Sequence, residues 1–398
     1  MTGRITRLEI EGYKSLKHVV WEPGKLNILI GPNGSGKSNL LRLLEMLAAS
    51  AKGQLADSIN KDGGLQLVLW DRRSERIVVR LIALLSSDDS GPALNRHDEF
   101  TYDITFGQHE YGNWLFISKE SLDYRSHASS KTGTYINRYG GRGKYFAEDG
   151  REAELQSQSD SESALHQLTT QSHALVGISQ FRDYLSKFKF YCHPVTTFGS
   201  TIRQPQMARY EKQLAPNGQN LINFLHTLYT EKSAFAENID HLMKAAFGDT
   251  YEKLVFSPAA DQYIQMRVPW KNLEYAQPAA LLSDGILKFL FLASIFSNPD
   301  LPSLIGIDEP DVGFHPSVLH IIAEMASEAS ERTQVVLATH SPEFLNAIQD
   351  VNPDVSVSVM EWSEGETLLK NLSGEKLQYW LKEYRLGEMF RSGGLEAL

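Results

Sequence analysis

A glycine-rich stretch near the start of the chain has the residue types of a phosphate-binding loop. Residues 31–38 read Gly-Pro-Asn-Gly-Ser-Gly-Lys-Ser, with the glycines, lysine and hydroxyl spaced as in such loops. Gly34 and Gly36 allow backbone N–H groups to turn toward phosphate oxygens, where a Cβ would obstruct them. Lys37 is expected to reach the β- and γ-phosphates, and Ser38 to ligate Mg²⁺. The alternative is a glycine turn that only joins a strand to a helix.

Two adjacent carboxylates follow an apolar run in the second half of the chain. Residues 304–309 read Leu-Ile-Gly-Ile-Asp-Glu, which predicts a buried strand that ends in Asp308 and Glu309. Asp308 is expected to bind Mg²⁺ directly or through water. Glu309 would polarise the water that attacks the γ-phosphate. The alternative is an acidic turn after a core strand.

A serine and a histidine complete the candidate chemistry. Leu282-Ser283-Asp284-Gly285 precedes a strongly apolar stretch, and taken alone Ser283 is a helix N-cap. It also lies shortly before the carboxylate pair, where it resembles the serine loop of ABC-superfamily ATPases, which meets the γ-phosphate of the partner subunit. Gln334–Thr339 predicts a buried strand, and His340 closes it. We interpret His340 as a γ-phosphate sensor, against the alternative of an ordinary surface or core histidine.

The elements that must position these residues can be read from the apolar pattern. Asn27–Ile30 predicts a buried parallel strand, and Asn39–Ala49 predicts a helix that is apolar almost all round. Ile286–Phe296 predicts another buried helix. The stretches 66–70 and 76–80 are expected to be strands. A short amphipathic helix is expected in the tail, around Leu377, Trp380, Leu381 and Tyr384.

The middle of the chain differs in character from both ends. Residues 86–172 are rich in Ser, Asp, Gly, Tyr and Arg, and aliphatic residues are few over 126–160. We expect an insertion with some strands and a mobile polar segment, without the heptads of a coiled coil. The predicted division is 1–85 for the N-terminal part of an ATPase core, 86–189 for the insertion or lid, 190–370 for the C-terminal part of the core, and 371–398 for a tail.

Composition excludes several classes of protein. The chain has a net charge of −10, which gives nucleic-acid binding no support. One cysteine, Cys192, excludes an internal disulfide framework and a zinc site built from several cysteines. The longest apolar run, 286–296, falls short of the roughly 20 residues that span a bilayer. The first residues lack the apolar core of a signal peptide, and a cytoplasmic location is expected.

Taken together, these motifs resemble those of the RecF/SMC-like ABC ATPases. The matching stretches are Gly31–Asn39, Leu282–Gly285, Ile307–Pro316 and Thr339–Pro342, with further similarity at Ile10–Ser15 and Asn217–Leu221. They are most similar to the prokaryotic AAA-type ATPases akin to the OLD (overcoming lysogenisation defect) proteins. This resemblance implies an α/β fold: an ABC-type P-loop ATPase with a mixed β-sheet core, helices on both faces and an inserted lid or arm.

The resemblance also implies a head-to-tail homodimer, or a higher oligomer, with ATP and Mg²⁺ between the subunits. One subunit would supply Lys37, Ser38, Asp308, Glu309 and His340, and the other Ser283. Other expected nucleotide contacts are Asn33, Gly34, Ser35, Gly36, Asn39 and Gly285. Lys14 matches a basic residue near the nucleotide in this family, although a solvated lysine is an equal alternative. Gln204 and Gln206 are the candidates for the glutamine of the family's Q-loop.

Several biological roles fit such a site. OLD proteins continue into a Toprim nuclease domain that this length does not accommodate, so a separate effector protein, a nuclease or a toxin, is expected in prokaryotic anti-phage defence. The alternatives are a RecF-like repair ATPase that binds DNA and an ATP-bound scaffold with negligible turnover. A transporter ATPase is disfavoured by Asp284, where transporters have glycine, and by the long insertion. No membrane partner is expected.

Overall fold

The computed structural model describes residues 2–86, 97–109, 112, 114–126, 131–146, 151–157, 159–169, 175–372 and 385–394. These residues form two compact units. The first comprises Met1–Lys189, Pro302–Gly306 and Ser356–Gln378, and the second comprises Phe190–Leu301, Ile307–Val355 and Tyr379–Leu398. The tail helix expected around residues 377–384 lies outside the described residues. None of the described helices is long and apolar enough to cross a membrane.

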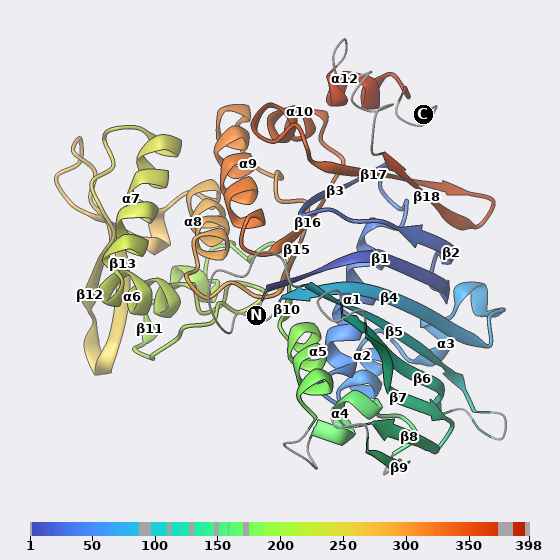
Figure 1. Cartoon of the computed structure of the whole chain (residues 1–398). Helices are drawn as coiled ribbons and strands as arrows, with labels where there is room; N and C mark the ends of the chain where they lie inside the picture. The colour runs from blue at the N-terminus through green and yellow to red at the C-terminus, as the bar shows by residue number, and fades with distance from the viewer. Residues whose placement is uncertain are drawn as a thin grey trace. The chain divides into compact units, whose positions relative to one another are not determined.

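The first unit is built on an eight-stranded antiparallel sheet, in the order β2-β1-β4-β5-β6-β7-β8-β9 (Figure 1). Its strands are β1 (Thr2–Tyr13), β2 (Leu16–Trp21), β4 (Arg76–Ser86), β5 (His97–Gln108), β6 (Leu115–Ser126), β7 (Thr132–Tyr139), β8 (Arg142–Phe146) and β9 (Glu152–Gln156). Alternate residues of β5, Phe100, Tyr102, Ile104 and Phe106, are buried, as expected of a sheet with one face in the core. The insertion therefore supplies strands that continue the sheet of the N-terminal part.

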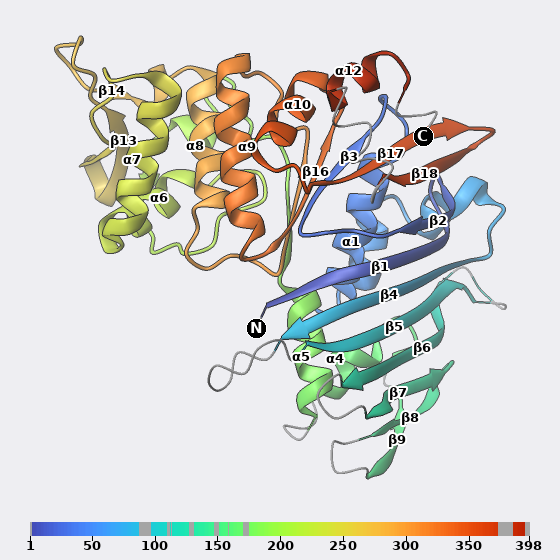
Figure 2. The same ribbon diagram turned by 45° about the horizontal axis from the view of Figure 1, so that its top comes forward.

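The helices of the first unit lie beside this sheet, as Figure 1 and Figure 2 both show. They are α1 (Lys37–Ser50), α2 (Leu55–Lys61), α3 (Leu65–Val68), η1 (Trp70–Arg72), α4 (Ala164–Thr169) and α5 (Val176–Ser186). The predicted helix over 39–49 is confirmed as α1. The strand predicted over 66–70 is wrong. Gly63 and Gly64 have positive φ angles of 93° and 95° and turn the chain directly into α3, and only an isolated bridge from Leu69 to Tyr13 pairs this stretch.

A second group of strands in the first unit carries the glycine-rich loop. β3 (Leu26–Ile30) runs parallel to β17 (Ser356–Ser363), and β17 is antiparallel to β18 (Glu366–Leu372). All five residues of β3 are buried, which confirms the buried parallel strand predicted from its apolar run. Residues that are far apart in the sequence thus lie together beneath the loop.

A buried ion pair ties the sheet of the first unit to α4. Glu120 and Arg138 are both fully buried, with 3.5 Å between Oε2 and Nη1. Glu120 accepts hydrogen bonds from the Tyr102 hydroxyl and from the backbone N–H groups of Ala164 and Leu165, at 2.9, 2.7 and 3.3 Å. Burial raises the pKa of Glu120, an effect that the N–H donors and the arginine oppose.

The second unit is mainly helical and has a small sheet. Its helices are η2 (Thr201–Arg203), α6 (Leu221–Glu231), α7 (Ser233–Phe247), η3 (Ala260–Gln262), η4 (Ala279–Leu281), α8 (Asp284–Phe296), α9 (Pro316–Ser330), α10 (Pro342–Val351) and α12 (Leu386–Arg391). In the small sheet β13 (Tyr263–Val268) pairs with β11 (Gln206–Met207), β12 (Val255–Pro258) and β14 (Gln277–Pro278). The helix predicted over 286–296 is confirmed as α8, which is buried along most of its length.

Two short strands carry the second set of candidate residues. β15 (Leu304–Asp308) crosses the division between the units after Gly306, as β10 (Phe188–Tyr191) does after Lys189. β16 (Gln334–Thr339) is buried throughout, and it lies next to the end of β15. The strands predicted from the apolar runs 304–308 and 334–339 are therefore confirmed.

Candidate functional site

The glycine-rich loop connects β3 to α1 in the first unit, and its glycines have different roles. Gly34 and Gly36 have φ angles of 83° and 104°, a backbone conformation that L side chains rarely adopt. A Cβ on Gly31 would meet the Met360 carbonyl at 2.0 Å, whereas one on Gly34 would meet nothing within 4 Å. Gly31 is therefore required by close packing, and Gly34 faces open space above the loop. Since no side chain caps the start of α1, the helix presents its positive end there.

Lys37 holds its ammonium group inside this loop. Its side chain is buried, and Nζ donates to the carbonyl oxygens of Gly31 and Pro32 at 2.7 and 2.9 Å. Ser35 Oγ is also buried, and no hydrogen-bond partner reaches it among the described residues. Ser38 is exposed at the start of α1. A buried cation, a helix N-terminus and an accessible hydroxyl in one loop fit a polyphosphate with a bound Mg²⁺.

A chain of hydrogen bonds that the sequence did not reveal supports the loop from below. Asn39 Nδ2 donates to Ser15 Oγ at 2.8 Å. Thr367 Oγ1 lies 2.7 Å from Ser15 Oγ and 2.9 Å from the Ser35 carbonyl. Because a hydroxyl has one proton, Thr367 donates to the carbonyl and Ser15 donates to Thr367. Strand β18 thereby fixes the position of the loop. Thr367 also makes Gly36 obligatory, since a Cβ there would come within 2.2 Å of its hydroxyl.

Lys14 lies in the turn between β1 and β2, with an unusual positive φ of 45°. Its Nζ is 2.6 Å from Asp62 Oδ2, and Arg42 lies 3.0 Å from the other oxygen of the same carboxylate. The structure thus gives Lys14 a carboxylate partner, so it is not simply a solvated lysine. Whether Lys14 contacts a nucleotide stays a prediction.

Glu309 and His340 meet in the second unit, just after the ends of the neighbouring strands β15 and β16. Glu309 Oε1 is 3.0 Å from His340 Nδ1, and both side chains are partly exposed. Glu309 has a positive φ of 54°, and its N–H donates to the Ala338 carbonyl at 2.7 Å. The turn after β15 therefore aims the carboxylate at the histidine. An ionised Glu309 accepts from Nδ1–H, which leaves Nε2 directed away from the pair.

Polar groups behind this pair hold the turn in place. Asp311 is buried, and its Oδ1 accepts a hydrogen bond from Thr339 Oγ1 at 2.6 Å. Burial raises the pKa of Asp311, and the Thr339 hydroxyl opposes this rise. The N–H of Ser341 donates to the same Thr339 hydroxyl at 3.0 Å. The segments on either side of Glu309 and His340 are thus hydrogen-bonded to each other.

A second histidine, which sequence reasoning missed, lies close to the same carboxylates. His193 follows β10, and its Nε2 is buried without a hydrogen-bond partner among the described residues. Burial and the charge of Lys288 lower the pKa of His193, while Glu309, Asp308 and Asp311 act in the opposite direction. A histidine two residues after a strand was the available signal, weaker than that of His340, which follows its strand directly.

Ser283 caps helix α8, which confirms the interpretation of this serine as an N-cap. Its Oγ accepts from the Ile286 N–H at 3.3 Å. Ser283 and Asp284 are both exposed, and the Ser283 hydroxyl keeps its proton to donate elsewhere. Gly285, in the first turn, has nothing closer than 3.9 Å to a built Cβ. The cap and a role toward a ligand are therefore compatible.

Of the two glutamines considered for the Q-loop, Gln206 has a structural role. Its amide donates to the carbonyls of Thr201 and Gln219, at 3.1 and 2.8 Å, and its oxygen accepts from Asn223. Gln204 is exposed. The structure thus groups Asn33–Asn39 with Lys14 in the first unit, and Asp308, Glu309 and His340 in the second unit.

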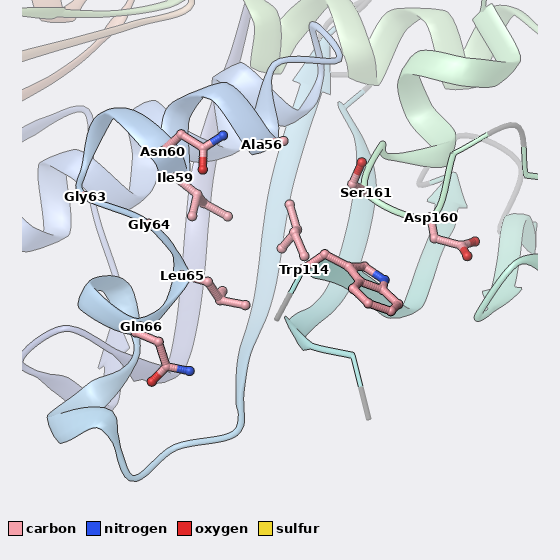
Figure 3. Close-up of a pocket in the computed structure, with 11 residues that line it drawn as sticks. Ala56, Ile59, Asn60, Gly63, Gly64, Leu65, Gln66, Trp114, Asp160 and Ser161 are labelled. Carbon is pink, nitrogen blue, oxygen red and sulfur yellow. The ribbon is translucent and has the colours of Figure 1, made fainter. Parts of the chain in front are cut away.

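A cavity of about 590 Å³ in the first unit is separate from these groups (Figure 3). Ile59 and Leu65, from α2 and α3, point toward the indole of Trp114, with Asp160 beyond it. The indole is half-exposed and stacks on His109, with 4.8 Å between ring centroids. None of the predicted nucleotide-contacting residues lines this cavity. Across all the described ranges, no group of three or more His, Cys, Asp or Glu residues could hold a metal ion. A metal ion bound by the candidate residues would therefore have few protein ligands.

Comparison with known structures shows the fold. The chain is similar to the head of an SMC protein bound to the C-terminal winged-helix domain of ScpA, with a TM-score of 0.50, 16% identity, and coverage of 94% of this chain and 99% of that one. It is also similar to an SMC head with an extended coiled coil, bound to the C-terminal domain of ScpA, derived from Pyrococcus furiosus. Here the TM-score is 0.53, the identity 13%, and the coverage 96% and 99%.

Sequence comparison gives shorter matches. The chain is 40% identical over 87 residues to structural maintenance of chromosomes protein 1 of Arabidopsis thaliana, which is 20% of this chain and 7% of that protein. It is 45% identical over 42 residues to protein 5 of the same series and organism, 10% of this chain and 4% of that protein. The chain thus spans a small part of these relatives.

A family profile described as "AAA domain, putative AbiEii toxin, Type IV TA system" matches residues 26–163 and 202–346, well over half of the chain. The predicted α/β fold of an ABC-type P-loop ATPase and the resemblance to SMC and RecF-like ATPases are confirmed, while the narrower OLD-like subgroup stays a prediction. The chain belongs to the AAA-domain family of putative AbiEii toxins of type IV toxin–antitoxin systems, and it has the fold of an SMC/RecF-like ABC ATPase.

Proposed function

We propose that this protein hydrolyses ATP with Mg²⁺ and uses its nucleotide state to control a separate effector protein. The observation that carries the hydrolysis is the pair formed by Glu309 and His340, 3.0 Å apart at the ends of two buried strands. A carboxylate held by an unusual backbone turn beside an imidazole suits proton transfer and positioning of a water molecule. A protein that only stored ATP would need neither side chain.

The residues of the loop bind the substrate in this proposal. The backbone N–H groups of residues 33–38 and the Lys37 ammonium neutralise the triphosphate, and the loop conformation is set by Gly34, Gly36 and the bond from Thr367. Mg²⁺, when bound, neutralises negative charge on the phosphates, and the hydroxyl of Ser38 and the carboxylate of Asp308 are the oxygen ligands of the kind it prefers. We assign the two sets of residues to one reaction because their motifs together resemble those of ABC ATPases.

The chemistry of the second unit follows from its hydrogen bonds. Glu309 orients the attacking water and accepts its proton, because its carboxylate is partly exposed and already fixed in direction by His340. His340 donates through Nδ1, and its Nε2 is left to contact the terminal phosphate. Ser283 of a second copy is proposed to complete the site, with the positive end of α8 behind it.

The coupling to an effector is supported by the binding partners named for similar proteins. Two SMC heads with this fold are bound to domains of ScpA, and the family description names a toxin–antitoxin system. A nuclease or toxin encoded separately, in prokaryotic anti-phage defence, is the partner we propose. DNA as a ligand has no specific support, since the net charge of the chain is −10.

Replacement of Glu309 by glutamine tests the proposal directly. The wild type is expected to bind a fluorescent ATP analogue and release phosphate. Glu309→Gln should keep the binding and lose phosphate release by roughly 100-fold or more, as expected for a general base. Lys37→Ala should lose the binding itself. Glu324→Gln, an exposed carboxylate on α9, is the matched control and should behave as the wild type.

The same variants separate the enzyme from the scaffold. Phosphate release that is equal in the wild type and in Glu309→Gln, or undetectable in both while ATP is bound, would rule out the hydrolytic proposal. The dimer is tested with Glu309→Gln, which should shift from monomer to dimer on addition of ATP and Mg²⁺ in light-scattering measurements. A mass that stays unchanged at saturating ATP would contradict the shared site.

A further inference from the structure

Arg203 is a buried arginine beneath the loop that leads to Ser283. It lies in η2, and its side chain is 8% exposed. Nε donates to the Thr196 carbonyl at 2.5 Å. Nη1 lies within hydrogen-bonding distance of the carbonyls of Ala279, Ala280 and Leu282, at 3.3, 3.2 and 2.5 Å. One guanidinium group therefore gathers the carbonyls of η4 and of the residue that immediately precedes Ser283.

The remaining nitrogen of the same guanidinium binds a carboxylate at the protein surface. Nη2 is 2.5 Å from Asp284 Oδ1, and the Asp284 side chain is 63% exposed. Asp284 is the first residue of α8 and adjoins the cap, Ser283. A buried cation thus reaches outward to an exposed anion, at the position where transporter ATPases have glycine.

We propose that Arg203 is a positioning residue that sets the Ser283 loop to receive the phosphates of a nucleotide held by a second copy of this chain. It does so by fixing the backbone of residues 279–282 and by neutralising the charge of Asp284. The inference rests on the proposed function, because it names the partner of that same site. Arg203 itself touches neither the nucleotide nor the reacting atoms.

The need for such a residue follows from the charge at position 284. A carboxylate beside Ser283 would repel a triphosphate, and the repulsion would be strong where water is excluded between two subunits. An arginine at 2.5 Å cancels that charge locally without leaving the protein interior. Glycine at this position, as in transporters, would carry no charge and need no counterion. Arg203 and Asp284 therefore act as a matched pair.

The geometry also explains why arginine is needed in place of lysine. The guanidinium group has five N–H donors in a rigid fork, and here it contacts four carbonyls and one carboxylate. A lysine has three donors on one atom and cannot serve four carbonyls and a carboxylate at once. Arg203→Lys should therefore retain the fold and lose part of the positioning.

The first experiment measures binding and assembly separately. Arg203→Ala and Arg203→Lys should bind the fluorescent ATP analogue with the wild-type Kd, since the loop at residues 31–38 is intact. ATP-dependent dimerisation and phosphate release should fall about 10- to 100-fold for alanine, the usual range for loss of a buried charged hydrogen bond, and less for lysine. Arg332→Ala, which removes an arginine with a bond to the Phe296 carbonyl, is the control and should retain both activities.

Removal of the carboxylate tests the charge argument. Arg203→Ala combined with Asp284→Gly should recover a substantial part of the dimerisation lost by Arg203→Ala alone, because the unpaired anion is gone. A merely structural arginine would give no such recovery, so a double variant no better than the single one would overturn the charge-pairing part of the proposal. Wild-type dimerisation and turnover in Arg203→Ala would overturn it entirely.

Mixing two defective proteins tests the action on the second copy. Arg203→Ala keeps an intact loop with Lys37, and Lys37→Ala keeps an intact Ser283 loop, so a head-to-tail heterodimer contains one complete site. An equimolar mixture should recover up to about a quarter of wild-type turnover, since half of the dimers are mixed and each has one of two sites intact. No recovery would contradict the inference. A wild type without ATP turnover would instead refute the proposed function.

Discussion

Replacement of Thr367 by valine is expected to weaken nucleotide binding although Thr367 lies outside the glycine-rich loop. The side chain is fully buried on β18, and its hydroxyl links Ser15 to the Ser35 carbonyl through contacts of 2.7 and 2.9 Å. Valine has nearly the same shape, so the change opens no large cavity. It removes the donor to the buried Ser35 carbonyl, and the Ser15 hydroxyl loses its acceptor but still accepts from Asn39.

The magnitude follows from the Ser35 carbonyl, which loses its hydrogen-bond donor. A buried polar group deprived of its partner costs about 1–3 kcal/mol. We therefore expect the free energy of unfolding of Thr367→Val to fall by about 2 kcal/mol. If the whole range of about 1–3 kcal/mol is lost from nucleotide binding, ATP affinity falls roughly 5- to 150-fold, at about 1.4 kcal/mol for each factor of ten.

The assay pairs urea unfolding with titration of a fluorescent ATP analogue. Thr6→Val is the control, because it loses one bond, 3.3 Å long, to the Ile82 carbonyl on an unrelated part of the sheet. It should lower stability by less than about 1 kcal/mol and leave ATP affinity unchanged. A Thr367→Val protein with wild-type affinity would refute the claim that β18 fixes the loop, even if its stability fell.

Three further outcomes are expected from the first unit. Arg138→Met removes one partner of the buried pair with Glu120 and should lower the free energy of unfolding by about 3–5 kcal/mol; a urea midpoint like that of the wild type would contradict this. Burial raises the pKa of Glu120, so its contribution to stability is greatest below its unfolded pKa of about 4.5 and declines as pH rises through the folded pKa. Between pH 4.5 and 7.5, Glu120→Gln should therefore lose less stability than the wild type. Parallel stability curves for the two proteins would contradict this. Gly31→Ala would drive a methyl group into the Met360 carbonyl and should shift the loop enough to abolish binding of the ATP analogue. Gly365→Ala is the control, because Gly365 has a positive φ and open space around it. This change should lower stability but leave binding of the ATP analogue in place.

The sequence predicted the parts of the fold whose signal is local. The strand and helix around residues 31–38, the strands before Asp308 and His340, and the helix after Ser283 all follow from short apolar runs that end at distinctive residues. Each signal lies within about ten residues. Such short signals do not show which strands lie side by side. Glu309 and His340 were therefore both predicted as site residues, but the contact between them was not.

Other features depend on residues far apart and could not be predicted in this way. Ser15 and Thr367 are separated by 352 positions, and Arg203 and Asp284 by 81, so no motif joins them. The stretch 66–70 was misread because its apolar residues fit a strand by composition, while two glycines before it decide the backbone. The alternation of Phe100, Tyr102, Ile104 and Phe106 was present in the sequence and would have indicated the strand that extends the large sheet.

The bond between Thr367 and the loop has a consequence for how the protein is made. A chain that has left the ribosome as far as α10 already exposes every residue of 31–38, but β17 and β18, which hold those residues in place, have not yet emerged. At about 5–20 residues per second, the interval between Ser15 and Thr367 is roughly 20–70 s. Throughout that interval the nascent polypeptide would lack a fully formed nucleotide loop. Cellular ATP is therefore expected to favour finished molecules over partly translated ones, so that ligand capture itself marks completion of synthesis.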